Sequence, residues 1–223
     1  MGLYADEQFN RCLRYFGDLF AFRDFGILPR LPTMEQLVEV EQGVNLLRSK
    51  GIEGPELDRR AAENLEFAYM RARNDYAELL ATDAMLTFFH HCYALKDWIK
   101  NEQPLGDAIR AQVEAFVAAS PELLACADIA NGSKHLKLDR PRSGQAQDLV
   151  VRGFEWDGKR VRVSHLYAGE RAGPQLEAFD LANACMGQWA NFLGKPWEPR
   201  LASDERSRRA LAAAFEKATQ QPK

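Results

Sequence analysis

The sequence predicts a mainly α-helical protein, a bundle of about six helices with one β-hairpin inserted at about residues 148–167. Three observations favour this fold class. Apolar residues recur at three- and four-residue spacing through most of the chain. These stretches end at proline or glycine. The spacing changes to two only around Asp157-Gly158, a dipeptide typical of tight hairpins.

Composition excludes several classes of protein. The 223 residues include 46% hydrophobic and 27% charged residues, which is typical of a globular domain and not of a disordered or collagen-like chain. The longest apolar runs are far shorter than the roughly 20 residues of a membrane span, so no membrane partner is expected. The first residues carry acids where a secretory signal needs basic ones, which predicts a cytoplasmic protein.

The first half of the chain predicts three helices. An apolar stripe covers residues 5–25 and ends at Gly26. Thr33 and Gln36 form a capping box that opens a helix to Lys50. From Pro55 to Asn101 there is neither proline nor glycine after the first turn, which predicts a long helix. Because Thr82 and Asp83 are capping residue types, we expect a break near residues 81–83.

The second half predicts three more helices and the hairpin. A short helix is expected at 104–119, and Ser120-Pro121-Glu122 opens the next, which dissolves around Pro141. A two-residue loop at Asp157-Gly158 would pair Trp156 with Lys159. The remaining expected segments are strands at 148–156 and 159–167, a helix from Pro174 to Gly194, and a last helix capped by Ser203-Asp204-Glu205.

These elements suggest a division into three parts. Residues 1–54 would form an N-terminal helical appendage packed on the bundle. Residues 55–200 would form the bundle with its hairpin, and residues 201–223 a C-terminal helix and tail.

The candidate site is a polar seam between two helices. His90 and Asp97 are seven residues apart, as are Asp128 and His135, so each pair lies on one face of its helix, with Asn131 to the side. If the faces meet, a carboxylate could orient an imidazole and tune it toward neutral pH. The alternative is that His90 and His91, which follow Phe88-Phe89, are structural residues with satisfied hydrogen bonds.

The sequence contains no recognised catalytic or cofactor motif that would favour another enzyme class. The sequence lacks a phosphate-binding Gly-rich loop, a dinucleotide fingerprint, a nucleophile elbow and a zinc-protease motif. His90, His135, Cys92 and Cys126 are metal-ligand types, but their spacing supports no metal site, and the four cysteines lack a C-x-x-C pair. We therefore expect no metal, no cofactor, and free, mostly buried thiols in a reducing compartment.

Basic charge is concentrated just after the candidate histidine. The chain carries a net charge of −3, yet residues 134–171 hold nine basic and five acidic residues, a local net charge of +4. Such a patch could bind phosphate, whereas the alternative is a solvated hairpin face whose charges protect its edges. The candidate phosphate-binding residues are Lys137, Arg140, Arg142, Arg160 and Arg162.

Around Asn131-Gly-Ser-Lys134-His135 the sequence resembles the HEPN superfamily of prokaryotic helical-bundle proteins, over residues 60 to 193. Asn131 matches the polar position of the family motif and His135 its histidine, while Ala130 stands where the family has arginine. It is also similar to uncharacterised bacterial helical proteins that share a Phe-His-His-rich helix, the Cys126-Ala-Asp-Ile-Ala-Asn-Gly-Ser-Lys-His segment and a hairpin.

The resemblance implies RNA binding or metal-independent RNA cleavage in a toxin or defence system, by a homodimer whose paired motifs form one cleft. His135 would act as general acid and base, Asn131 and Asp128 would orient it, and Lys134 or a hairpin arginine would offset phosphate charge. His90 and Asp97 complete the candidate catalytic set. Two alternatives stay open: a non-catalytic helical interaction or dimerisation module, favoured by Ala130, and a nucleotide or small-molecule binder that uses the basic hairpin.

Overall fold

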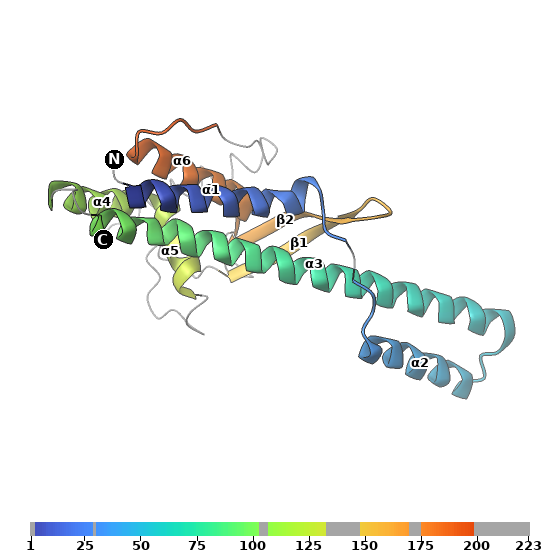
Figure 1. Cartoon of the computed structure of the whole chain (residues 1–223). Helices are drawn as coiled ribbons and strands as arrows, with labels where there is room; N and C mark the ends of the chain where they lie inside the picture. The colour runs from blue at the N-terminus through green and yellow to red at the C-terminus, as the bar shows by residue number, and fades with distance from the viewer. Residues whose placement is uncertain (1–2, 29, 103–106, 133–147, 170–174, 199–223) are drawn as a thin grey trace. The chain divides into compact units, whose positions relative to one another are not determined.

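The computed structural model confirms a mainly helical protein (Figure 1). It describes residues 3–28, 30–102, 107–132, 148–169 and 175–198. In this part of the chain the elements are α1 Leu3–Asp24, α2 Met34–Ser49, α3 Gly54–Asn101, α4 Asp107–Ala119, α5 Pro121–Gly132, β1 Asp148–Trp156, β2 Val161–Gly169, β3 Gln175–Glu177 and α6 Ala178–Phe192.

The chain divides into two compact units. The first unit comprises Met1–Ala21, Thr82–Gly153 and Ser164–Lys223, and the second comprises Phe22–Ala81 and Phe154–Val163. Most of α1 belongs to the first unit, and the N-terminal half of α3 belongs to the second.

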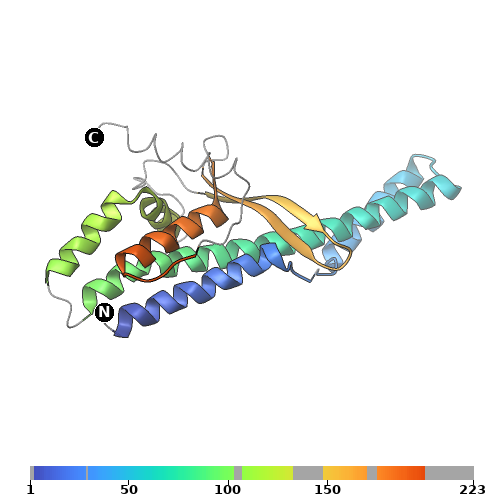
Figure 2. The same cartoon turned by 90° about the horizontal axis from the view of Figure 1, so that it is seen from above.

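The core of the first unit is aromatic and lies between helices. In Figures 1 and 2, α1 runs alongside the C-terminal half of α3, with α6 next to them. Phe20 of α1 meets Phe179 of α6 edge to face, with ring centroids 5.4 Å apart. Phe88 and Trp189 are also fully buried there. This burial supplies the main stabilisation of the unit.

A short strand precedes the last described helix. The sheet has the order β1-β2-β3, and β3 pairs antiparallel to β2, with Tyr167 opposite Glu177. The helix expected from Pro174 therefore begins only at Ala178. The Glu177 carboxylate caps it by accepting a hydrogen bond from the Asp180 N–H at 2.8 Å.

In the second unit, α2 packs against the N-terminal half of α3. The expected capping box is present, because the Thr33 hydroxyl accepts from Gln36 N and the Gln36 side chain accepts from Thr33 N. Gly43 lets α2 approach Asn64 of α3 closely. None of the α2 residues is buried, so the two helices leave much of their surface open to solvent.

The hairpin turn lies one residue later than expected. Asp157 N donates to the Arg160 carbonyl, so the two central residues are Gly158 and Lys159. The predicted pairing of Trp156 with Lys159 is therefore wrong, and β2 begins at Val161. The reason is that the Asp157 carboxylate accepts both the Lys159 and Arg160 N–H groups, which places Asp157 at the first turn position.

The expected break in the long helix is also wrong. Helix α3 runs for 48 residues without interruption. Thr82 is partly exposed and Asp83 is exposed. Good helix formers, including the buried Ala81 and Met85, flank them, so their capping tendency is overridden. The position still has meaning, because the two compact units divide between Ala81 and Thr82.

None of the described helices combines the length and apolar character that a bilayer span requires. The expected last helix, from Ser203, lies outside the described residues.

Candidate functional site

Part of the predicted site lies outside the described residues. This applies to His135 and to the basic side chains Lys134, Lys137, Arg140 and Arg142. Helix α5 is described up to Gly132, so the structure defines the surroundings in which this segment begins.

His90 joins the two helices of the predicted seam. Its Nε2 lies 2.7 Å from the Ala130 carbonyl oxygen at the end of α5. A carbonyl oxygen can only accept a hydrogen bond, so Nε2 carries the proton in this contact. Helices α3 and α5 therefore touch at this point, one residue before Asn131, through a side chain of α3 and a main-chain carbonyl of α5.

The α5 residues of the motif differ in exposure. Asp128 is buried with 1% of its surface exposed, whereas Asn131 is only partly buried. Ala130, at the family's arginine position, is also 1% exposed. An arginine at residue 130 would not fit without displacing the helices around it, because cores are close-packed.

His91 has a structural environment. Its ring stacks on Tyr15 of α1 with centroids 4.4 Å apart, and the Gln8 amide contacts both its Nδ1 and its main-chain carbonyl. Burial, with smaller contributions from Arg11 and His90, lowers the pKa of His91. The neighbouring histidines thus face different helices, α5 for His90 and α1 for His91.

The described contacts of Asp97 lie away from those of His90. Asp97 is exposed and pairs with Lys96 at 2.6 Å, two turns or about 10 Å further along α3. It lines a shallow pocket of about 310 Å³ with Tyr4, Trp98, Asn101 and Glu102. The Glu102 carboxylate there accepts the Tyr4 and Ala5 N–H groups and caps α1. These contacts give Asp97 no part in orienting His90.

Of the predicted phosphate-binding residues, Arg160 and Arg162 are described, both in the second unit. Arg160 donates to the Phe25 carbonyl at 3.4 Å. The Nε of Arg162 is buried and has no hydrogen-bond partner among the described residues. Hydrogen bonds from Arg160 N and Lys159 N lower the pKa of Asp157, which keeps a negative charge at the hairpin tip.

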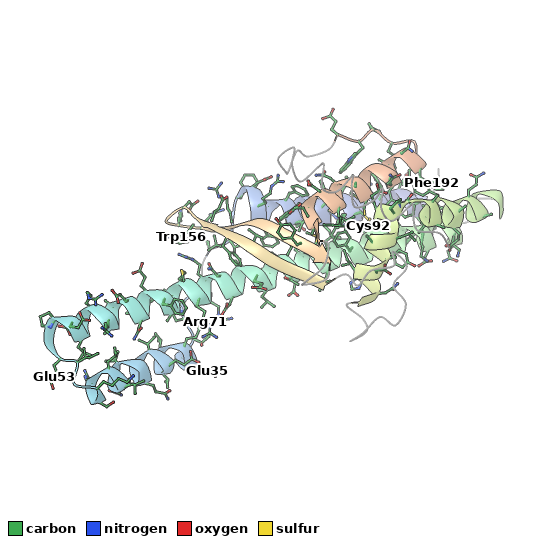
Figure 3. All side chains as sticks on the ribbon, turned by 180° about the vertical axis from the view of Figure 1, so that it is seen from behind. Glu35, Glu53, Arg71, Cys92, Trp156 and Phe192 are labelled. Atoms are coloured by element: carbon green, nitrogen blue, oxygen red, sulfur yellow. The ribbon has the colours of Figure 1, made fainter. Side chains whose placement is uncertain are left out.

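Sequence reasoning missed a cluster of cysteines in the first unit. Cys92 of α3, Cys126 of α5 and Cys185 of α6 have sulfur atoms that all lie within 4.8 Å of one another. All three are fully buried, and Cys92 lies among the packed helices in Figure 3. The sequence offered a weak signal, since each cysteine sits on the apolar face of its helix, but nothing local relates residues so far apart.

The three thiols of the cluster differ in the direction of their pKa shifts. Burial raises the pKa of the Cys92 and Cys126 thiols. Burial also opposes ionisation of Cys185, but hydrogen bonds from Cys126 and Cys92 outweigh it and lower the pKa of Cys185 to about 6. All four cysteines of the chain are free and buried, as the sequence predicts.

Comparison with known proteins does not assign the chain to a family. The chain matches no protein-family model, no curated protein and no solved structure.

Proposed function

We propose that this is a HEPN-like RNA-binding protein that cleaves RNA without a metal ion, in the cytoplasm and as part of a toxin or defence system. The observation that carries the proposal is the contact between His90 Nε2 and the Ala130 carbonyl at 2.7 Å. It brings a second imidazole to the start of the segment that contains Asn131 and His135.

The proposed reaction needs no cofactor. His135 takes the proton of a ribose 2′-hydroxyl, whose oxygen attacks the adjacent phosphorus. The bond from phosphorus to the 5′ oxygen breaks, the leaving oxygen takes the proton from protonated His135, and the product ends in a 2′,3′-cyclic phosphate. Asn131 and Asp128 orient His135, and Lys134 or basic residues that follow it offset the phosphate charge.

The histidines provide the test. Purified full-length protein is incubated with structured and single-stranded RNA in excess EDTA, and products are analysed for cyclic phosphate ends. Acid–base assistance is worth about 10²- to 10⁴-fold, so His135→Ala should slow cleavage at least tenfold. His90→Gln should also slow it, because the α3 contact with α5 is altered.

His91→Gln is the matched control. It changes the adjacent histidine, which packs on α1, and should leave cleavage by the folded protein unchanged even if the melting temperature falls. The cleavage proposal fails if the wild type is inert in EDTA or if His135→Ala cleaves equally fast. RNA binding is measured separately, by fluorescence anisotropy at several salt concentrations. Removing Arg140 and Arg142 should weaken binding and reduce its salt dependence, whereas removing exposed Arg59 should not.

Two observations favour a second function, in which the chain is a non-catalytic dimerisation module. Ala130 supplies no charge for a phosphate and is buried. Helix α2 has no buried residue, while Met34, Leu46 and Phe67 of the α2–α3 pair are exposed. Two such helix pairs could complete a four-helix bundle between two copies of the chain. Light scattering tests it, because this function requires a dimeric mass and a monomer contradicts it.

A further inference from the structure

The cysteine cluster is a built feature of the first unit, because three separate helices contribute one sulfur each. Cys92, Cys126 and Cys185 come from α3, α5 and α6. In a triangle with sides of 4.8 Å, a central ion would lie about 2.8 Å from each sulfur, compared with about 2.3 Å for a zinc–sulfur bond. A side-chain adjustment of about half an ångström would therefore bring all three within bonding distance.

A second observation points to the same place. The indole N–H of Trp189 on α6 is fully buried and has no hydrogen-bond partner among the described residues. Its side chain lies beside Cys92. A buried donor without an acceptor is costly, and a metal-bound thiolate at Cys92 would supply one.

We propose that Cys92, Cys126 and Cys185 form a three-coordinate site for a single Cu(I) ion. This proposal is independent of RNA binding or cleavage. When the ion binds, each S–H that becomes a ligand releases its proton to solvent, and three sulfur–copper bonds form without any change in oxidation state.

The chemistry of the site selects among soft metals. Thiolates favour Cu(I), zinc and iron–sulfur clusters. Structural zinc is almost always four-coordinate, and the described residues offer three ligands in a site whose sulfurs are closed to water. Iron–sulfur clusters are usually held by four cysteines and need room for several atoms. Three sulfurs closed off from solvent therefore fit a single Cu(I) best.

The competing explanation is a core of neutral thiols. Without metal, the Cys126 thiol donates to the Phe89 carbonyl at 3.5 Å and the Cys185 thiol donates to the Glu122 carbonyl at 3.3 Å. Cysteine is a common small core residue, so these bonds could be its whole role. The two explanations differ in whether the three sulfurs act together on one ion.

The test is a Cu(I) titration of the reduced full-length protein under anaerobic conditions, with bicinchoninate as the competing chelator. We expect one Cu(I) per chain. Cys92→Ala, Cys126→Ala and Cys185→Ala should each lower the affinity at least tenfold. Because the sulfurs are buried, each sample is incubated until the chelator colour is constant.

Cys12→Ala is the matched control. Cys12 is equally buried in the same unit but does not belong to the cluster, so this variant should keep the wild-type affinity. Circular dichroism verifies folding. For the wild type, X-ray absorption at the copper edge should show three sulfur neighbours, a result that needs no variant.

Four outcomes would overturn the proposal. The first is an affinity that survives loss of a cluster cysteine or falls equally in Cys12→Ala. The second is a wild type that does not take copper from bicinchoninate, and the third is a first shell with oxygen, nitrogen or fewer than three sulfurs. The fourth is a parallel titration in which Zn(II), and not Cu(I), binds stoichiometrically through these cysteines.

Discussion

Glu177 is an acidic side chain that the fold keeps away from water at the start of α6. Burial raises its pKa to about 8, and the nearby Asp180 adds to the effect, while main-chain N–H groups oppose it. The unfolded chain ionises this carboxyl near pH 4.3. Between these pH values the unfolded state has released a proton that the folded state keeps, so stability is lost as the pH rises from about 4.5 to 8.

Glu177→Gln should remove this pH dependence. The amide oxygen can still accept the Asp180 N–H and carries no charge to bury. At pH 5 the variant and the wild type should have similar free energies of unfolding. At pH 8.5 the variant should be more stable by at least about 1 kcal/mol, measured by urea unfolding. Glu39→Gln, at an exposed glutamate, is the control, and parallel pH profiles for Glu177→Gln and wild type would contradict the assignment.

At the level of single residues, the sequence identifies candidate site residues better than it predicts which way their side chains face. The spacing of Asp128 and His135 predicts that both lie on one face of a helix, and the contact of His90 with the Ala130 carbonyl shows that α3 and α5 touch near the described end of α5. The sequence could not distinguish the role of His90 from that of His91. Adjacent side chains point 100° apart around a helix, and the helices that pack against each side decide their roles. The same limit concealed the cysteine cluster, which depends on how three helices rotate against one another.

Among the elements, local chemistry predicted the ends of helices well. The capping box of Thr33 depends on residues three positions apart, so it needs no tertiary information. Strand β3 was missed because three residues carry almost no periodicity and pairing with β2 defines it. The hairpin turn was predicted one residue too early, because the Asp157 side chain selects the turn.

Gly26, between α1 and the β2 edge, is a position where only glycine fits. Its φ is +69°, and an added Cβ would lie 2.8 Å from the Val161 carbonyl oxygen and 2.9 Å from Arg162 Cγ. Ile27 exchanges two main-chain hydrogen bonds with Val161 at this point. Gly26→Ala should therefore destabilise the protein by about 2–4 kcal/mol, because backbone strain and steric overlap add.

Gly51→Ala separates the two causes. Gly51 also has a positive φ, +78°, but open space surrounds its Cβ position. This variant should cost about 1 kcal/mol, from backbone strain alone. Urea unfolding of both variants measures the difference, and equal losses would show that the approach to Val161 is not tight.

For the whole molecule, averages of the sequence conceal local differences. The net charge of −3 contains a segment, residues 134–171, with a net charge of +4. The 46% hydrophobic content likewise includes apolar side chains that the described chain leaves exposed in the second unit. Composition predicts a globular protein but cannot predict which apolar residues lack a partner, because that depends on which helices the fold places together.

The α2–α3 pair of the second unit offers the clearest such surface. In Figure 3, Glu35 and Glu53 mark the start of α2 and the loop that joins it to α3, and Arg71 of α3 forms an ion pair with Glu39 of α2. Apolar side chains nevertheless remain exposed on both helices along the pair. They are Met34, Val38, Leu46, Leu65, Phe67, Tyr69, Met70 and Leu79.

The dimerisation module proposed above would use this surface, because a second copy of the chain would bring a helix pair of the same length with an equally open apolar surface. Leu46→Ser with Phe67→Ser, at side chains 56% and 60% exposed, should raise the dimer dissociation constant at least tenfold without unfolding the monomer. Leu13→Ser, at an apolar residue of the first unit that is 36% exposed, should leave it unchanged. Light scattering across a concentration series measures the dissociation constant. A wild type that stays monomeric would refute an interface built on α2 and α3, and so would a double variant that dimerises as well as the wild type.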